Sequence, residues 1–233
     1  MPSDHAGAPH RGKPARARLT SGYAKSLATR RAILRAAIAA FGRRGFSAVT
    51  TREIASAAGV NQPAINYHFG GKEGLYQACA QEILDRFVQP LGQVSQRSAA
   101  ALAHGLDRRA AARELEGLLS ALADVMILSR EVSEAADFVH REMREPGLAY
   151  SHLYNNLWSP GTELAARLVA AVKGRPRAHE CDRIDAIMLI SGIAAFVPGS
   201  AVAMDILRWQ EAGEAGKALV LERLKVQIQA WVH

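Results

Sequence analysis

The chain has 233 residues, 49% of them hydrophobic and 22% charged, which is ordinary for a globular protein built of one small and one larger domain. Alanine is abundant and only 6% of the residues are aromatic, so an all-α fold is favoured over a sheet sandwich. The formal net charge is +7, and the longest apolar run, residues 186–197, is too short for a membrane span.

Positive charge is concentrated in the N-terminal part of the chain. Residues 1–90 contain 13 Lys or Arg and 5 Asp or Glu, a balance of +8, whereas residues 91–233 contain 16 and 17, a balance of −1. A basic face of this kind suits a polyanion such as duplex DNA. The alternative is a basic tail that only keeps the protein soluble. That alternative accounts for the cations in residues 11–18 but not for their proximity to the helical motif in residues 50–72.

Residues 1–25 are predicted to form a disordered basic arm, because residues 1–22 are rich in Ala, Gly, Pro, Arg and Lys and have no periodic apolar face. Such an arm adds attraction to phosphates or reaches an adjacent minor groove, and the sequence favours the first. The segment has no apolar core typical of a signal peptide, and Cys79 and Cys181 have no CxxC partner. We therefore expect a cytoplasmic protein with reduced thiols, no metal site and no cofactor.

The first predicted helix begins at Ser26 or Thr29 and ends at Arg44, before Gly45. Arginines occupy its outer side. Its apolar stripe consists of Ile33, Leu34, Ala37, Ile38 and Phe41.

Residues 50–72 predict two short helices joined by a tight turn, which is a helix-turn-helix. Thr50 and Glu53 have the spacing of a capping box, so the first of the two helices should begin at Thr51. Gly59 should end it, because a sharp turn after a helix favours a residue that tolerates positive φ.

The second helix of this motif is predicted over Gln62 to His68. Asn61 is expected to cap it, and Pro63 is tolerated in its first turn, where backbone N–H groups lack partners. Gly70 and Gly71 follow. A short helix with an exposed polar side suits the major groove of B-DNA.

The remainder predicts further helices and no alternating strand. The next helix begins at Lys72 or Glu73, and Pro90 kinks or ends it. Residues 92–106 are either its continuation or a loop. The other predicted helices cover Asp107–Ser129, Ser133–Glu145, Ala149–Lys173 with a kink or break at Pro160-Gly161, Ala178–Val197, Ala203–Trp209 and Glu214–Val232.

Residues 29–84 resemble the N-terminal domain of the TetR family of bacterial transcriptional repressors. The resemblance rests on AILRAAIAAFGRRGFSAVTTREIASAAGV and INYHFGGKEGLYQA, including the spacing from Gly59-Val60 to Tyr67-His68-Phe69 and Lys72-Glu73. A shorter stretch, FVHREMREP at 138–146, is similar to the REM-x-EP motif of the CecR-like branch. The resemblance implies a DNA-binding domain over 26–72 and a helical effector-binding and dimerisation domain over 73–233.

The resemblance also implies which side chains contact DNA. Gln62 and Asn66 would pair with adenine edges, Pro63 or Ala64 would meet a thymine methyl group, and hydroxyl or cationic groups would meet phosphates. The alternative for His68 is a surface histidine that packs on Phe69, and for Arg52 it is an ordinary solvated charge. The expected contacts are Thr50, Thr51, Arg52, Gln62, Pro63, Ala64, Asn66, Tyr67, His68 and Lys72.

A single helix-turn-helix reads only a few base pairs. A homodimer would place two DNA-binding domains on a palindromic operator, with recognition helices about 34–36 Å apart. In the family, two C-terminal helices build a four-helix interface. The alternative is that these are core helices of a monomer. The expected interface residues are Ile187, Ile190, Ala194, Leu221, Leu224, Ile228 and Trp231.

The resemblance implies a pocket for a small effector that lowers DNA affinity by preferring the state with spread reading heads. The alternative is that Arg141-Glu142 is an exposed ion pair and that the aromatic residues simply pack. The candidate pocket residues are Met126, Phe138, Arg141, His152, Tyr154 and Trp158.

Nothing in the sequence favours an enzyme. The adjacent residues His179-Glu180-Cys181 diverge around a helix and cannot share a metal as HExxH can. There is no GxSxG, GxxxxGK or dinucleotide fingerprint. Two functions remain: a dimeric repressor released from its operator by a small molecule, and a DNA-binding protein of the non-sensing or nucleoid type.

Overall fold

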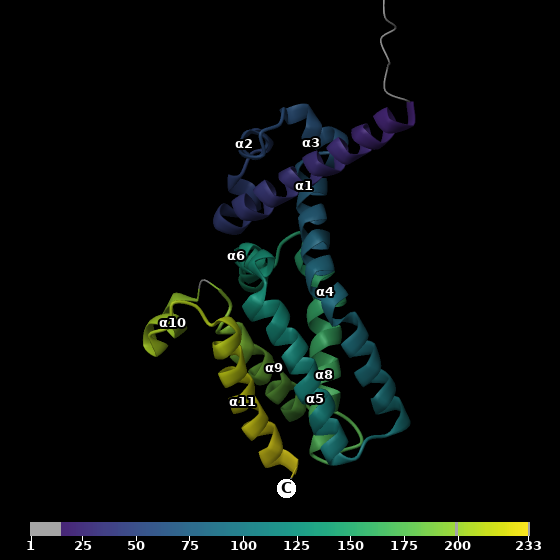
Figure 1. The fold of residues 1–233 in the computed structure, drawn as a ribbon, viewed down its shortest axis with the longest axis vertical. Coiled ribbons are helices and arrows are strands. Elements are labelled where there is room, and N and C mark those ends of the chain that lie inside the picture. Colours follow the sequence, from purple (N-terminus) through teal and green to yellow (C-terminus); the bar gives the residue numbers. More distant parts are fainter. Residues whose placement is uncertain (1–14, 199, 233) are drawn as a thin grey trace, which may run out of the picture.

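The computed structural model describes residues 15–198 and 200–232, and every regular element within these ranges is a helix. The predicted all-α fold is therefore confirmed. Three helices form a head at one end of the molecule. The long helix α4 runs from that head into a larger helical body (Figure 1).

The head consists of α1 (Ala15–Ala48), α2 (Thr51–Ala57) and α3 (Gln62–Phe69). Gly45 interrupts α1 with non-helical angles of φ 78° and ψ 170°, so the predicted end of the first helix is confirmed. The predicted disorder is wrong for residues 15–25, which continue α1 toward the N-terminus; alanine, arginine and leucine in that stretch are strong helix formers. Residues 1–14 of the predicted arm lie outside the described residues.

The body follows in chain order. Its two π-helical segments, η1 and η2, each continue directly from the helix before them. The elements are α4 (Lys72–His104), α5 (Arg108–Ala123), η1 (Asp124–Leu128), α6 (Arg130–Arg144), α7 (Tyr150–Leu153), η2 (Tyr154–Trp158), α8 (Ser159–Val172), α9 (Glu180–Ala194), α10 (Ala201–Leu207) and α11 (Gly213–Val232).

The structure resolves two points that the sequence left open. Residues 92–104 continue α4 despite Pro90 inside it, so only 105–107 form a loop. The break expected at Pro160-Gly161 lies instead in the π-helical segment η2. Pro160 follows η2 as the second residue of α8, and the chain stays helical through it.

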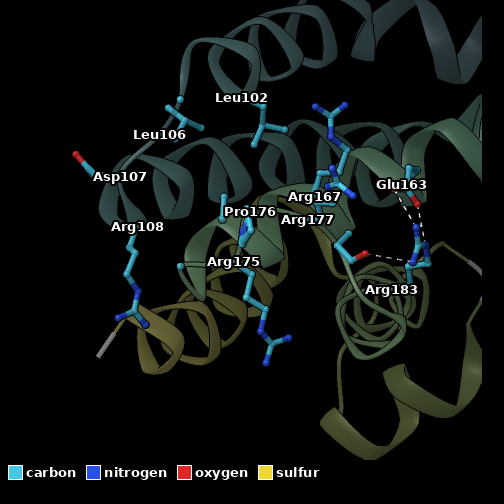
Figure 2. Close-up of a pocket in the computed structure, with 14 residues that line it drawn as sticks. Leu102, Leu106, Asp107, Arg108, Glu163, Arg167, Arg175, Pro176, Arg177 and Arg183 are labelled. Carbon is cyan, nitrogen blue, oxygen red and sulfur yellow. Dashed lines mark hydrogen bonds and ion pairs between the residues drawn. The ribbon is translucent and has the colours of Figure 1, made fainter.

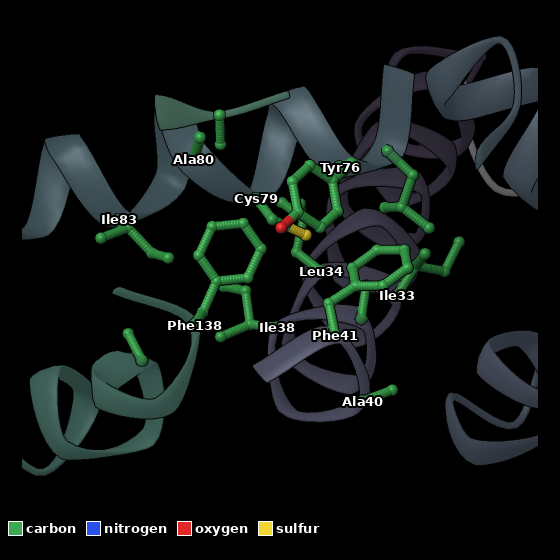
Figure 3. Close-up of a cluster of buried hydrophobic side chains, with 14 of the residues drawn as sticks. Ile33, Leu34, Ile38, Ala40, Phe41, Tyr76, Cys79, Ala80, Ile83 and Phe138 are labelled. Atoms are coloured by element: carbon green, nitrogen blue, oxygen red, sulfur yellow. The ribbon is translucent and has the colours of Figure 1, made fainter. Parts of the chain in front are cut away.

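Two hydrophobic clusters hold the molecule together. The first joins the head to α4 and α6, and its centre is shown in Figure 3, where Phe41, Tyr76 and Phe138 meet. The Tyr76 ring lies 4.9 Å from that of Phe41 and 4.8 Å from that of Phe138, between centroids. The second cluster unites α5, α8, α9 and α11 in the body. The head thus shares its core with α6, although nearly a hundred residues separate them along the chain.

Within the described residues, no helix is both long enough and apolar enough to cross a lipid bilayer.

Candidate nucleic-acid interface and ligand cavity

The start of α2 has the predicted capping box. Glu53 N–H donates to Thr50 Oγ1 at 3.2 Å, and Thr50 N–H donates to Glu53 Oε2 at 2.8 Å. The Thr50 hydroxyl also donates to Glu53 at 2.8 Å, so both polar groups of Thr50 are engaged within the head. Thr51 accepts a hydrogen bond from Gln62 at 3.1 Å and keeps its own hydroxyl hydrogen for an outside acceptor. Thr51 is therefore better placed than Thr50 to donate to a phosphate.

Arg44 fastens this cap to α1. Its guanidinium lies 3.0 Å from Glu53 Oε1. The hydrogen bond from Arg44, together with those from Thr50, lowers the pKa of Glu53 from 4.5 to about 2. Because the folded value lies below the unfolded one, the charged carboxylate stabilises the head above pH 4.5, and this contribution is lost as the pH falls toward 2.

Replacing Glu53 by glutamine should therefore lower the melting temperature at pH 7, with a difference from the parent protein that shrinks as the pH falls below 4.5. Calorimetry of both proteins between pH 7 and pH 3 measures this difference. A gap that stays constant across the range would show that the charge of Glu53 adds nothing to its role as a cap.

The second helix of the motif, α3, divides as predicted into an inner and an outer side. Ile65 is fully buried, whereas Gln62, Pro63, Asn66 and Tyr67 are exposed, Tyr67 to 83%. Gly70 ends the helix in the left-handed conformation at φ 73°. The exposed polar side is free to enter a groove.

Two expectations for α3 need revision. Asn61 occupies the cap position with extended backbone, but its side chain makes no capping hydrogen bond, so that prediction is wrong. The helix is short, and Pro63 removes one of the N–H groups that a cap would satisfy. His68 is half-buried, with its ring 5.0 Å from that of Tyr67 and 6.0 Å from that of Phe69 between centroids. Packing on Phe69, the alternative considered for His68, is the arrangement observed.

Three more predicted contacts complete the head. Arg52 is exposed and Ala64 is half-buried. Lys72 begins α4, and its ammonium group lies 4.4 Å from the centre of the Phe46 ring. This cation–π contact holds the charge at the junction of head and body without neutralising it.

Replacing Lys72 by alanine should reduce the slope of log affinity against log salt by about one, because one phosphate contact and its released counterions are lost. Fluorescence anisotropy on a short duplex at several salt concentrations gives the slope. The matched control is Arg109→Ala, which removes an exposed cation at the start of α5 in the body. If all three proteins have the same slope of log affinity against log salt, Lys72 does not contact a phosphate.

A largely apolar cavity of about 230 Å³ lies inside the body, between the two hydrophobic clusters. Both π-helical segments contribute to its wall, Met126 from η1 and Trp158 from η2, and π turns are frequent at functional sites. These are two of the six predicted effector residues. The polar groups on the wall are few: Ser95, His140, Thr162 and Ser191.

The other four candidate residues do not line this cavity. Phe138 is buried in the core shared with the head. Arg141 donates to the backbone carbonyls of Gly42 and Arg43, both at 3.1 Å. His152 contacts Gln81 at 2.9 Å on the surface, and Tyr154 is 45% exposed, stacked on Tyr150 with 5.8 Å between ring centroids.

Sequence reasoning also missed residues that do line the cavity. Phe87, Leu91 and Ser95 recur every four residues along α4, and Val139, His140 and Met143 come from α6. The spacing along α4 was a usable signal, because side chains four apart share a helix face. The sequence alone does not show which other helices pack around that face of α4.

The REM-x-EP stretch joins the head to the body. Glu142 is buried, accepts the Tyr76 hydroxyl at 2.5 Å and accepts Gly147 N–H at 3.1 Å. Arg141, next to it, satisfies the last carbonyls of the first helix before Gly45. The alternative of an exposed Arg141-Glu142 ion pair is therefore wrong; Arg141 faces Glu145 at 3.7 Å instead.

Most of the predicted dimer residues of α11 lie on the side of the helix that packs against the body. Leu224 and Ile228 are buried in the body core, and Leu221 and Trp231 pack against it. Ile190 and Ala194 of α9 face the cavity, so Ile187 is the one predicted residue that is well exposed. Helix α11 has two faces with apolar residues. The more apolar face, which includes Leu224 and Ile228, packs into the core of the chain itself. On the last three helices the large apolar residues that are exposed are Ile184, Ile187 and Met188 of α9, Val202, Ile206 and Leu207 of α10, and Leu219 and Val226 of α11.

Within the described residues, no three His, Cys, Asp or Glu side chains are placed to hold a metal ion together. Cys79 is buried, and burial raises the pKa of its thiol, which makes it unreactive. Cys181 is exposed.

Comparison with known proteins links both halves of the chain to transcriptional regulators. Residues 33–79 match the family model described as bacterial regulatory proteins, tetR family, and residues 111–230 match the C-terminal domain of the HTH-type transcriptional dual regulator CecR. The chain is 36% identical over 160 residues to the dual regulator CecR of Shigella flexneri, which covers 68% of each protein.

Solved structures share the fold. A TetR-like transcriptional regulator from Rhodococcus sp. RHA1 superposes with a TM-score of 0.58 at 23% identity, over 87% of this chain and 96% of that one. AibR, solved in complex with isovaleryl coenzyme A and operator DNA, gives a TM-score of 0.58 at 16% identity, over 85% and 97% of the respective chains.

Proposed function

Because the chain belongs to the CecR-like branch of the TetR family of transcriptional regulators, we propose that it is a dimeric repressor that a small apolar effector releases from a palindromic operator. The observation that carries the proposal is the exposed polar side of α3, presented by a head that shares its core with the effector-binding body. The named relatives are regulators rather than enzymes.

Operator reading is assigned to α3. Gln62 and Asn66 are exposed, lie four residues apart on one side of the helix, and have amide groups that can pair bidentately with adenine. Thr51, Arg52 and Lys72 flank them and would bind phosphates, which fixes the position of the head on the duplex.

The second copy of this chain is assigned to the exposed apolar face of α9 and α11. Ile184, Ile187 and Met188 form a stripe along α9, and Leu219 and Val226 continue the exposed apolar surface on α11. Apolar residues this exposed on two neighbouring helices cost free energy in water, and a symmetric partner would bury them. Val202 and Ile206, 74% and 75% exposed on the projecting helix α10, would extend the contact onto the partner (Figure 1).

The effector is assigned to the cavity behind Trp158. Its apolar wall and few polar groups suit a small apolar molecule with one or two polar atoms. The relative AibR was solved with both an acyl thioester ligand and operator DNA, which supports coupling between ligand and operator in this fold.

Helix α6 is the proposed route of that coupling. Val139, His140 and Met143 line the cavity, while Arg141 of the same helix binds α1 of the head and Glu142 binds Tyr76 near the start of α4. A ligand that moves α6 therefore moves contacts of the head directly, and it releases the operator if it prefers the state with spread heads.

Footprinting on genomic fragments tests the repressor against the non-sensing alternative. A repressor protects one short palindrome, whereas a structural binder coats DNA with little sequence preference. A thermal-shift screen of small apolar compounds then tests sensing. A compound at 100 times its Kd should stabilise the protein by about 2.7 kcal/mol, and Trp158→Ala should abolish the shift. Protection of a palindrome without any stabilising compound would support a regulator that does not sense.

A further inference from the structure

We propose that a cleft lined by arginines, at the end of the body farthest from the head, binds a small organic molecule carrying a diphosphate or triphosphate group. The cleft measures about 880 Å³ and lies where α4 ends, α5 begins and α8 ends (Figures 1 and 2). It is separate from the effector cavity, with which it shares no residue. The arginines that line it are Arg108, Arg167, Arg175, Arg177 and Arg183.

The positive charge of the cleft is only partly compensated. Asp107 and Glu163 are the acidic residues that line it, against five arginines. Glu163 is occupied by Arg183, with oxygen to nitrogen distances of 2.8 and 3.2 Å. Asp107 accepts Ala110 N–H at 2.7 Å and thereby caps α5. Asp107 forms no ion pair with an arginine of the cleft, and the two carboxylates together balance only two of the five guanidinium charges.

Within residues 15–198 and 200–232, three guanidinium groups of the cleft have no carboxylate partner. Arg108 donates to the carbonyls of Val172 at 2.8 Å and Trp231 at 2.5 Å, which orient it without neutralising it. Arg167 and Arg177 form no ion pair with any residue in 15–198 or 200–232, and Figure 2 draws them beside each other along the cleft. An uncompensated cluster of this kind favours an anion with several charges.

The loop of residues 174–178 is held in place before any ligand arrives. Asp182 is fully buried and accepts Arg175 at 2.7 Å, Lys173 at 3.2 Å and His179 N–H at 3.0 Å. Gly174 takes a positive φ of 72°, which lets the chain turn out of α8. These bonds fix the backbone of the loop that carries Arg177, so binding would order arginine side chains but not the loop itself.

The arrangement selects phosphate among anions. Guanidinium groups bind phosphate oxygens bidentately, and charges contributed by α5, α8 and a loop match an anion with more than one phosphate group. Leu102, Leu106 and Ala171 add an apolar wall against which an organic group such as a nucleoside can lie. Glu163, Arg167 and Ala171 recur every four residues, so one face of α8 supplies a continuous side of the cleft.

Titration calorimetry at physiological ionic strength tests the proposal with inorganic pyrophosphate, ADP, AMP and adenosine as probes. ADP and pyrophosphate should bind, AMP more weakly, and adenosine not measurably. The double variant Arg167→Ala/Arg177→Ala should bind ADP at least tenfold more weakly, because two charge-assisted contacts to phosphate are lost. Both side chains are exposed, so its unliganded melting temperature should equal that of the parent.

Arg113→Ala is the matched control, because it removes an exposed arginine of α5 that does not line the cleft. Its ADP affinity should equal that of the parent protein. The proposal is overturned if millimolar pyrophosphate and ADP give no binding heat, if the double variant binds as well as the parent, or if citrate binds as tightly as pyrophosphate. Operator binding by the double variant should be unchanged, so this test is independent of the repressor assignment.

Discussion

Replacing Met188 by glutamate is expected to convert the proposed dimer into monomers and to weaken operator binding by about 10²–10⁴-fold. Met188 is 57% exposed, so the protomer tolerates the new carboxylate. In a symmetric interface each substitution is present twice, so two carboxylates would be desolvated without a partner. A monomer engages one half-site at a time and loses the gain from linking two heads, which spans about 10²–10⁴-fold.

Sedimentation equilibrium and operator titration measure the two effects together. The chain mass is 25.1 kDa, so the parent should sediment at twice that mass and the variant at that mass. Leu148→Glu is the control, because it replaces another exposed apolar side chain, in the loop between α6 and α7, by the same charge. If the Met188→Glu protein remains dimeric, the interface does not include Met188. If the parent protein is monomeric, the proposed dimer is wrong.

Replacing Tyr76 by phenylalanine is expected to lower the free energy of unfolding by about 2–3 kcal/mol, because the buried Glu142 carboxyl loses its closest donor. Burial, together with the bond to Glu142, raises the pKa of the Tyr76 hydroxyl, so the phenol stays a donor at every working pH. The aromatic contacts with Phe41 and Phe138 are preserved in the variant. The loss therefore reports the hydrogen bond and not the packing.

Urea denaturation of four proteins separates this bond from its surroundings. Tyr76→Phe, Glu142→Gln and the double variant form a cycle with the parent, and the coupling energy should exceed about 1 kcal/mol. A coupling near zero would mean that the two side chains stabilise the fold independently. Tyr23→Phe supplies a control, since that hydroxyl is on an exposed residue at the outer part of α1.

The head was the part of the structure that the sequence predicted best. Its signals are local: Thr50 with Glu53, Gly45 and Gly59 act through neighbours within a few residues, and each appears where it was expected. Asn61 failed for an equally local reason, since Pro63 leaves fewer N–H groups to cap.

The body was predicted less well because its features depend on which helices meet. Arg141 and Phe138 are of residue types that often line ligand pockets, but both lie on the side of α6 that contacts α1. Leu224 and Ile228 had the spacing of an interface and fill the core instead. Periodicity identifies the apolar face of a helix, but the same pattern arises whether a partner subunit or the chain's own helices cover it.

The unbroken course of α4 from the head to the cavity wall makes it a lever. From Lys72 at the head to Phe87 on the cavity wall the helix rises roughly 22 Å, at about 1.5 Å for each residue. A tilt of about 5° at the cavity would therefore carry the head sideways by roughly 2 Å, and in opposite directions in two symmetry-related copies. Because α4 is stiff, a small tilt is enough to change the distance between the two α3 helices so that it no longer matches the spacing of successive major grooves.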